Sequence, residues 1–173
     1  VTDFEEKPEH PTIDLASMGI YVFKADVLTR MLIEDTSNPA SGHDFGGDVM
    51  PAALAQGLRL HGYLYEGYWR DIGTVEAYWE SSMELLREPP PVRFDEPGQR
   101  IVSRSHKQPS ARVGAGAQVR QSILGSGSIV HGTVERSLIS PGVRIDHGAE
   151  VRDSVILHGA HIGQGAILDR AII

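Results

Sequence analysis

The stretch Val134-Glu135-Arg136-Ser137-Leu138-Ile139 decides the architecture of the C-terminal part of the chain, because its pattern returns at near-constant spacing. Each copy begins with an apolar residue, has serine or alanine in fourth place and ends on two apolar residues. The other copies are Val119–Leu124, Val151–Ile156 and Leu168–Ile173. Their first residues lie 15, 17 and 17 positions apart (119 to 134, 134 to 151, 151 to 168). Such self-similarity is typical of a parallel β-helix, in which three hexapeptides form one triangular coil.

Glycine-rich units fill the spaces between these copies, as in Val113–Gln118 and Ile162–Ile167. A β-sandwich also uses short strands, but nothing in its packing requires one hexapeptide to repeat at near-fixed spacing. We therefore predict a parallel β-helix of hexapeptide repeats over residues 111–173.

Four histidines of this region fall between the apolar positions of the repeats: His131, His147, His158 and His161. The His-x-x-His spacing of the last two is one that metal sites use. No carboxylate or third histidine completes it at a recognisable spacing, so we interpret all four as corner residues of the coils.

Composition excludes several classes of function. The 173 residues carry a formal net charge of −7, whereas a nucleic-acid surface needs clustered lysine and arginine. The chain has no cysteine, which excludes disulfides, thiol catalysis and cysteine-based zinc sites and is compatible with a reducing cytoplasm. No apolar run is long enough for a membrane span. Because the chain opens on Val1 and closes on the apolar run Ala171–Ile173, we expect a piece of a longer protein.

The heptad Tyr68-Trp69-Arg70-Asp71-Ile72-Gly73-Thr74 is the most informative stretch of the N-terminal part. The residues before it, Leu58–Tyr65, have the character of a strand. From Val75 to Leu86 apolar residues recur at helical spacing, with Thr74 as a plausible N-cap. Asp71 therefore stands where a strand gives way to a helix, which is where open α/β sheets bind ligands. A carboxylate there can hold Mg²⁺, although pairing with Arg70 is the simpler alternative.

Three further segments precede the heptad. Lys7 lies in a loop among acidic residues and is the only lysine or arginine before Lys24. Ser17-Met18-Gly19 is a turn that lets a ligand approach the backbone, and it leads into a predicted strand, Ile20–Phe23. Residues 43–48 (His-Asp-Phe-Gly-Gly-Asp) precede a short helix predicted over Val49–Gln56, and Asp44 or Asp48 can cap it.

Together, Glu6-Lys7-Pro8, Ser17-Met18-Gly19, His43-Asp44-Phe45-Gly46 and Trp69–Thr74, followed by a β-helix, resemble the ADP-glucose pyrophosphorylase (glucose-1-phosphate adenylyltransferase) family. The resemblance implies a partial, Rossmann-like α/β nucleotidyltransferase domain over residues 1–87. A linker at 88–110 and a truncated left-handed β-helix at 111–173 would follow. Independently of the resemblance, the spacing of apolar residues predicts another helix in the first domain, over Ala25–Asp35.

The resemblance also implies roles for individual residues. Lys7 meets the sugar phosphate and is catalytic, and Asp71 is one of two aspartates that hold the catalytic Mg²⁺. The implied contacts to glucose 1-phosphate are Glu6, Lys7, Ser17, Tyr21, Asp44, Phe45 and Trp69. The family's glycine-rich nucleotide loop, its second magnesium aspartate and its adenine pocket have no counterpart in these 173 residues. We therefore expect the chain alone to be inactive.

The implied reaction joins ATP and glucose 1-phosphate into ADP-glucose and pyrophosphate, the sugar-donor step of glycogen biosynthesis, in the cytoplasm. A homotetramer and small-molecule allosteric effectors are implied by the same resemblance, with no nucleic acid or membrane as partner. Two alternatives stay open: a nucleotidyltransferase for another sugar 1-phosphate, and a non-catalytic regulatory subunit of the same fold. Retention of both Lys7 and Asp71 counts against the second.

Overall fold

A computed structural model describes residues 1–5, 7–11, 13–93 and 108–173. Its described residues form two compact units, Val1–Glu66 and Gly67–Ile173. The predicted domain boundaries at 1–87, 88–110 and 111–173 stay a prediction, since most of 88–110 lies outside the described residues.

The first unit is built on three helical elements: α1 (Ala25–Thr36), a π-helical turn η1 (Phe45–Val49) and α2 (Met50–Ala55). Its small apolar core consists of Met31, Val49 and Ala53, with Phe23 and Phe45 packed against it. Gly57, at φ +73°, follows the end of α2, and its amide donates to the Leu54 carbonyl. This is the left-handed conformation by which glycine commonly ends a helix. The helices predicted over Ala25–Asp35 and Val49–Gln56 are confirmed by α1 and α2.

The two strands predicted in this region are not formed. The described residues of Val1–Glu66 contain no β-strand. The segments Ile20–Phe23 and Leu58–Tyr65 have no neighbouring strand to pair with. Ile20 is 75% exposed and Val22 is 96% exposed, so their apolar character is not used for burial here. A strand needs a neighbour to satisfy its backbone groups, and no described residues supply one.

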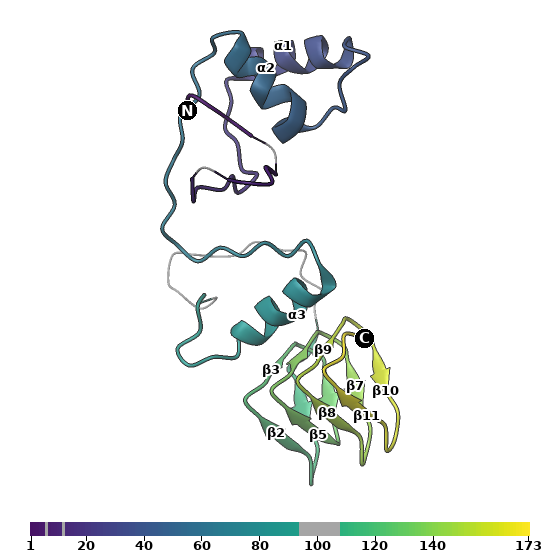
Figure 1. Cartoon of the computed structure of the whole chain (residues 1–173). Helices are drawn as coiled ribbons and strands as arrows, with labels where there is room; N and C mark the ends of the chain where they lie inside the picture. Colours follow the sequence, from purple (N-terminus) through teal and green to yellow (C-terminus); the bar gives the residue numbers. More distant parts are fainter. Residues whose placement is uncertain (6, 12, 94–107) are drawn as a thin grey trace. The chain divides into compact units, whose positions relative to one another are not determined.

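The second unit consists of α3 (Val75–Glu84) and a parallel β-helix, both visible in Figure 1. The β-helix has three sheets with the orders β1-β4-β7-β10, β2-β5-β8-β11 and β3-β6-β9. Its strands are β1 (Arg112–Val113), β2 (Gln118–Arg120), β3 (Ile123–Leu124), β4 (Ile129–Val130), β5 (Thr133–Glu135), β6 (Leu138–Ile139), β7 (Arg144–Ile145), β8 (Glu150–Arg152), β9 (Val155–Ile156), β10 (His161–Ile162) and β11 (Ile167–Asp169). Every ladder is parallel, so the predicted parallel β-helix is confirmed.

The register follows the sequence repeat. Val119, Val134 and Val151 are Cα partners in successive coils, and Leu168 pairs with Val151. Their side chains contribute to a core that runs through the centre of the coils, with Val134 and Val151 fully buried. The shorter offset of 15 residues arises at the corner His131-Gly132, which lies between β4 and β5. Gly132 is required there, because an added Cβ would lie 2.3 Å from the Ala149 carbonyl oxygen.

A second feature of the repeat is a column of left-handed corners. The third residue of each copy has a positive φ although none is glycine: Gln121 (44°), Arg136 (43°), Asp153 (47°) and Arg170 (51°). Non-glycine residues rarely adopt this conformation, so four at one register position mark a required corner of the coil. Helix α3 lies beside the coils (Figure 1), and two of these side chains reach it or the residues that follow it: Arg170 lies over the Trp79 ring, and Gln121 donates to the Leu86 carbonyl.

Candidate functional site

Within the first unit, the structure brings together Ser17, Tyr21 and Phe45, three of the residues predicted to contact sugar phosphate. The Ser17 Oγ and Tyr21 Oη atoms are 3.0 Å apart and hydrogen-bonded. The Tyr21 ring stacks on Phe45 with a centroid separation of 5.8 Å and an interplanar angle of 17°. Gly19 donates its amide to Ser17 Oγ at 3.2 Å, which closes the turn. The result is a hydroxyl pair carried on an aromatic stack, the combination of donors and flat apolar surface that suits a sugar.

Asp44, the next predicted contact, lies beside Phe45 and is used as a cap. Its Oδ1 accepts the Gly47 amide at 2.7 Å and so starts η1. Asp48 Oδ2 turns back to accept the amides of Gly42 and Asp44, both at 3.1 Å. This pair of aspartates fixes the loop that carries Phe45, because each carboxylate satisfies backbone donors of the other's segment.

Asp35, near the end of α1, also stabilises the loop that leads to Phe45, by hydrogen bonds to Ser41 and His43. Ser41 Oγ donates to Asp35 Oδ1 at 2.6 Å, and His43 Nδ1 lies 2.7 Å from Asp35 Oδ2. These hydrogen bonds, from Ser41 first and His43 second, lower the pKa of the Asp35 carboxyl. Asp35 was not predicted from the sequence, since nothing in α1 distinguishes it from its acidic neighbours.

Lys7, the predicted phosphate contact, is exposed and has a left-handed backbone with φ +45°. Glu6, its predicted neighbour in the site, lies outside the described residues. The structure leaves the roles of Lys7 and Glu6 as predictions.

Within the second unit, Asp71 and Trp69 are exposed on the segment that enters α3. Asp71 Oδ1 accepts the Gly73 amide at 3.0 Å, and Thr74 Oγ1 accepts the Ala77 amide at 3.1 Å, which confirms Thr74 as the N-cap. Among the described residues, nothing hydrogen-bonds the second carboxylate oxygen of Asp71. A hard oxygen open to solvent on a rigid turn fits one ligand of Mg²⁺. The described residues contain no group of three histidine, cysteine, aspartate or glutamate side chains that could hold a metal by themselves.

Arg70 does not pair with Asp71, which was the alternative interpretation of the heptad. Its Nε donates to Glu84 Oε2 at 2.9 Å, and its Nη2 donates to Glu84 Oε1. The Tyr68 hydroxyl donates to the same Oε2 at 2.9 Å. Glu84 is the last residue of α3, and its side chain is only 7% exposed. Hydrogen bonds from Arg70 first and Tyr68 second hold the pKa of the Glu84 carboxyl below its usual value.

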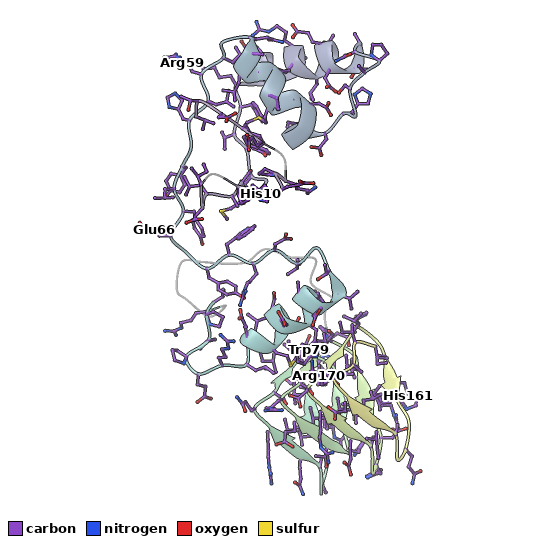
Figure 2. All side chains as sticks on the ribbon, in the orientation of Figure 1. His10, Arg59, Glu66, Trp79, His161 and Arg170 are labelled. Atoms are coloured by element: carbon purple, nitrogen blue, oxygen red, sulfur yellow. The ribbon has the colours of Figure 1, made fainter. Side chains whose placement is uncertain are left out.

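Helix α3 is attached to the coils at several left-handed corners, and Figure 2 shows Trp79 of the helix next to Arg170 of the coils. The Trp79 indole N–H donates to the Asp153 carbonyl at 2.7 Å, and the Arg170 guanidinium lies 4.4 Å from the centroid of the Trp79 ring. Just after the end of the helix, the Gln121 side-chain amide donates to the Leu86 carbonyl at 3.2 Å. The helix that begins beside Asp71 is thus held to the first, third and fourth copies of the repeat.

Comparison with known proteins places these features in a family. Residues 1–88 match the nucleotidyl transferase family. The chain belongs to that family. Residues 104–173 match the GlmU-like C-terminal hexapeptide family, in agreement with the observed β-helix.

Curated relatives extend the match over the whole chain. It is 40% identical over 173 residues to a glucose-1-phosphate adenylyltransferase of Bacillus cereus, covering 100% of this chain and 46% of that protein. A protein of the same name from Halalkalibacterium halodurans is 45% identical over 139 residues, which cover 80% of this chain and 36% of the relative. A third, from Desulfitobacterium hafniense, is 41% identical over 98% of this chain and 38% of the relative. These matches confirm the predicted resemblance, and the chain spans less than half the length of these relatives.

The predicted site residues therefore fall into two groups. Ser17, Tyr21 and Phe45 form one cluster with Asp44 beside it, while Trp69 and Asp71 are carried by the other compact unit. Sequence reasoning missed Glu84 and Tyr68. The sequence held one weak signal for Tyr68. Tyr68 and Arg70 alternate with the predicted site residues Trp69 and Asp71, so in an extended segment they face the side opposite to the site.

Proposed function

We propose that the full-length protein synthesises ADP-glucose and pyrophosphate from ATP and glucose 1-phosphate. The observation that carries this proposal is the similarity of the entire chain to proteins named glucose-1-phosphate adenylyltransferase. The cluster of Ser17, Tyr21 and Phe45 supports it, because hydroxyls beside a stacked aromatic pair are suited to a sugar ring.

The chain's own residues would act by positioning and by offsetting charge. A phosphate oxygen of glucose 1-phosphate attacks the α-phosphorus of ATP, the bond to the β-phosphate bridge breaks, and pyrophosphate leaves. Lys7 would hold the sugar phosphate as a flexible point charge and reduce its repulsion from ATP. Ser17, Tyr21, Asp44, Phe45 and Trp69 would orient the sugar, with Glu6 as a further contact.

Asp71 would supply one oxygen ligand for Mg²⁺, which when bound neutralises charge on the phosphates. Its turn is compatible with this role: Gly73 fixes one carboxylate oxygen, and the other faces solvent. Because Asp71 cannot complete a metal site with described residues alone, the remaining ligands would come from substrate phosphates and from other parts of the full-length protein.

Assembly and regulation are proposed on the resemblance alone: a cytoplasmic homotetramer that responds to small-molecule effectors. The net charge of −7 and the lack of a long apolar run are the grounds for expecting neither nucleic acid nor membrane as a partner. Among the described residues, no helix is both long and apolar enough to cross a membrane.

The test is a substrate panel on the full-length protein, with pyrophosphate release as the readout. ATP with glucose 1-phosphate should exceed every other pairing of ATP, UTP, GTP, CTP or dTTP with glucose, mannose or N-acetylglucosamine 1-phosphate. Preference for another pair would replace the proposed reaction by the related one, and no turnover with any pair would favour a regulatory subunit.

Asp71→Asn sharpens the test. Asparagine retains an oxygen for the Gly73 amide but loses the charge that Mg²⁺ requires, so turnover should fall on the order of a thousandfold with the fold intact. Asp169→Asn, an exposed aspartate on β11, is the matched control and should keep normal turnover. Near-normal turnover of Asp71→Asn at saturating Mg²⁺ would contradict the metal role.

A further inference from the structure

We propose that Glu84 is a positioning residue for Asp71 and Trp69: its buried carboxylate engages Arg70 and Tyr68, and thereby presents the two alternating residues of the heptad to the substrates. This inference rests on the proposed function for the roles of Asp71 and Trp69. It adds a residue that touches neither substrate nor metal.

The first support is the alternation of the segment. Tyr68 and Arg70 both turn toward Glu84, while Trp69 is 42% exposed and Asp71 is exposed. In an extended backbone, side chains alternate between two sides. Anchoring positions 68 and 70 on one carboxylate therefore directs positions 69 and 71 to the opposite side.

The second support is that the segment is attached to α3 at both of its ends. Arg70 is anchored at the last residue of α3, and Thr74 caps the first turn of the same helix. The helix rises about 15 Å between Thr74 and Glu84 at 1.5 Å per residue. The four residue steps from Arg70 to Thr74 span at most about 13–14 Å when fully extended. The segment that carries Asp71 is therefore attached to one helix at both of its ends, through Arg70 and through Thr74.

The third support is charge. Arg70 is adjacent to Asp71 in sequence and carries a guanidinium that binds carboxylates in a two-pronged geometry. Glu84 occupies that guanidinium through both of its oxygens. Without the Glu84 charge, Arg70 becomes available to Asp71, where it competes with a metal ion for the same carboxylate.

The test uses the full-length protein, with Mn²⁺ as a spectroscopic substitute for Mg²⁺. Binding is measured by electron paramagnetic resonance with a non-hydrolysable ATP analogue bound, because substrate phosphates are expected among the metal ligands. Melting temperature and steady-state kinetics are measured alongside. Glu84→Gln should weaken Mn²⁺ binding about tenfold or more, the usual effect of removing a residue that orients a metal ligand. The KM for glucose 1-phosphate should rise through Trp69. Arg87→Gln is the matched control: Arg87 also contacts Glu84, at 3.3 Å, but it follows the end of α3 and is not part of the heptad. It should change binding less than twofold.

A second set of variants separates positioning from folding. If Glu84→Gln does not fold, Arg70→Lys decides, because lysine keeps a cation at position 70 but cannot make the two-pronged contact. In the Asp71→Asn background, Glu84→Gln should cause no further loss of Mn²⁺ affinity, since both changes act on one ligand.

Each outcome is decisive. A lower melting temperature with unchanged Mn²⁺ affinity in the folded protein, or losses that add in the double variant, would make Glu84 a structural residue and overturn the inference. The proposed function is tested separately by the substrate panel, whose outcome does not depend on Glu84. If Asp71→Asn itself leaves Mn²⁺ affinity and turnover unchanged, the metal role of Asp71 is wrong, and positioning by Glu84 fails with it.

Discussion

Replacement of Ser154 by alanine tests why serine occupies the fourth place of the repeat. Ser154 is fully buried, and its Oγ donates to the Arg152 carbonyl at 2.5 Å and accepts the Ala171 amide of the next coil at 3.1 Å. The same arrangement occurs one coil earlier, where Ser137 Oγ accepts the Ser154 amide at 3.1 Å. The serines thus form a ladder of side-chain hydrogen bonds that joins successive coils beside the left-handed corners.

The cost of Ser154→Ala follows from the bonds that are lost. The Arg152 carbonyl keeps a second partner, since it also accepts the Arg170 amide at 3.1 Å. The amide of Ala171, a half-buried residue, loses its hydrogen bond to the fully buried Ser154 side chain. An unsatisfied buried donor costs about 1–3 kcal/mol, so we expect about 2 kcal/mol of lost unfolding free energy. For a unit of this size that corresponds to a decrease in melting temperature of roughly 10 °C.

The assay is thermal unfolding followed by circular dichroism, with urea unfolding to obtain the free energy. Ser126→Ala is the matched control, because Ser126 is an exposed serine of the same β-helix and should change the free energy by less than about 0.5 kcal/mol. Equal melting temperatures for the two variants would refute the ladder as a source of stability. Serine would then be retained in the repeat for its size alone.

Val151→Asp should unfold the coils, since Val151 is fully buried and an unpaired carboxylate there has no partner; an unchanged melting temperature would contradict its place in the core. Lys7→Gln in the full-length protein should raise the KM for glucose 1-phosphate by about one to two orders of magnitude and affect ATP far less. Equal losses for both substrates in steady-state kinetics would argue against a sugar-phosphate contact. The second unit should lose stability as pH falls through the lowered pKa of Glu84, because a depressed carboxyl pKa stabilises the fold only while the group is ionised. Urea unfolding between pH 7 and pH 3 measures this, and Glu84→Gln should flatten the profile.

The β-helix could be predicted from sequence because each coil pairs with the next one along the chain. Positions that repeat in sequence, such as Val134 and Val151, are therefore also neighbours in space. The short corner at His131-Gly132 even accounts for the single offset of 15 residues. The spacing of the sequence repeat therefore predicts which residues pair between neighbouring strands. In most β-sheets the sequence does not show this pairing directly.

The prediction of strands at Ile20–Phe23 and Leu58–Tyr65 was wrong, because the pairing partner of such a strand is not its neighbour in sequence. Their composition is that of buried strands, but composition does not supply a pairing partner. In a parallel sheet that partner is separated by a crossover of a dozen residues or more. The described residues of the first unit offer no such neighbour, so the apolar side chains of Ile20 and Val22 stay exposed.

In the candidate site, too, contacts between residues close in sequence could be predicted, whereas contacts between distant residues could not. The cap at Thr74 and the turn at Asp71 are set by residues two or three positions away, so the motif itself predicts them. The pairing of Arg70 with Glu84 spans 14 residues and selects one of three glutamates on α3, which also carries Glu76 and Glu80. Only the packing of the helix on the coils decides which of the three is buried.

That packing makes the presentation of Asp71 dependent on the coils. Helix α3 is fixed by Trp79 to Asp153 and Arg170, two left-handed corners that belong to the same backbone as the serine ladder. Arg70 is in turn fixed to the last residue of α3. Loosening the coils at Ser154 therefore removes support from the helix before it touches any residue of the proposed site. In the full-length protein, Ser154→Ala should consequently weaken Mn²⁺ binding only at temperatures where the coils begin to open, whereas Glu84→Gln should weaken it at all temperatures. The temperature profile of Mn²⁺ affinity distinguishes the two variants. A Ser154→Ala profile identical to that of the unsubstituted protein, even where the coils begin to open, would show that α3 holds Asp71 without help from the β-helix.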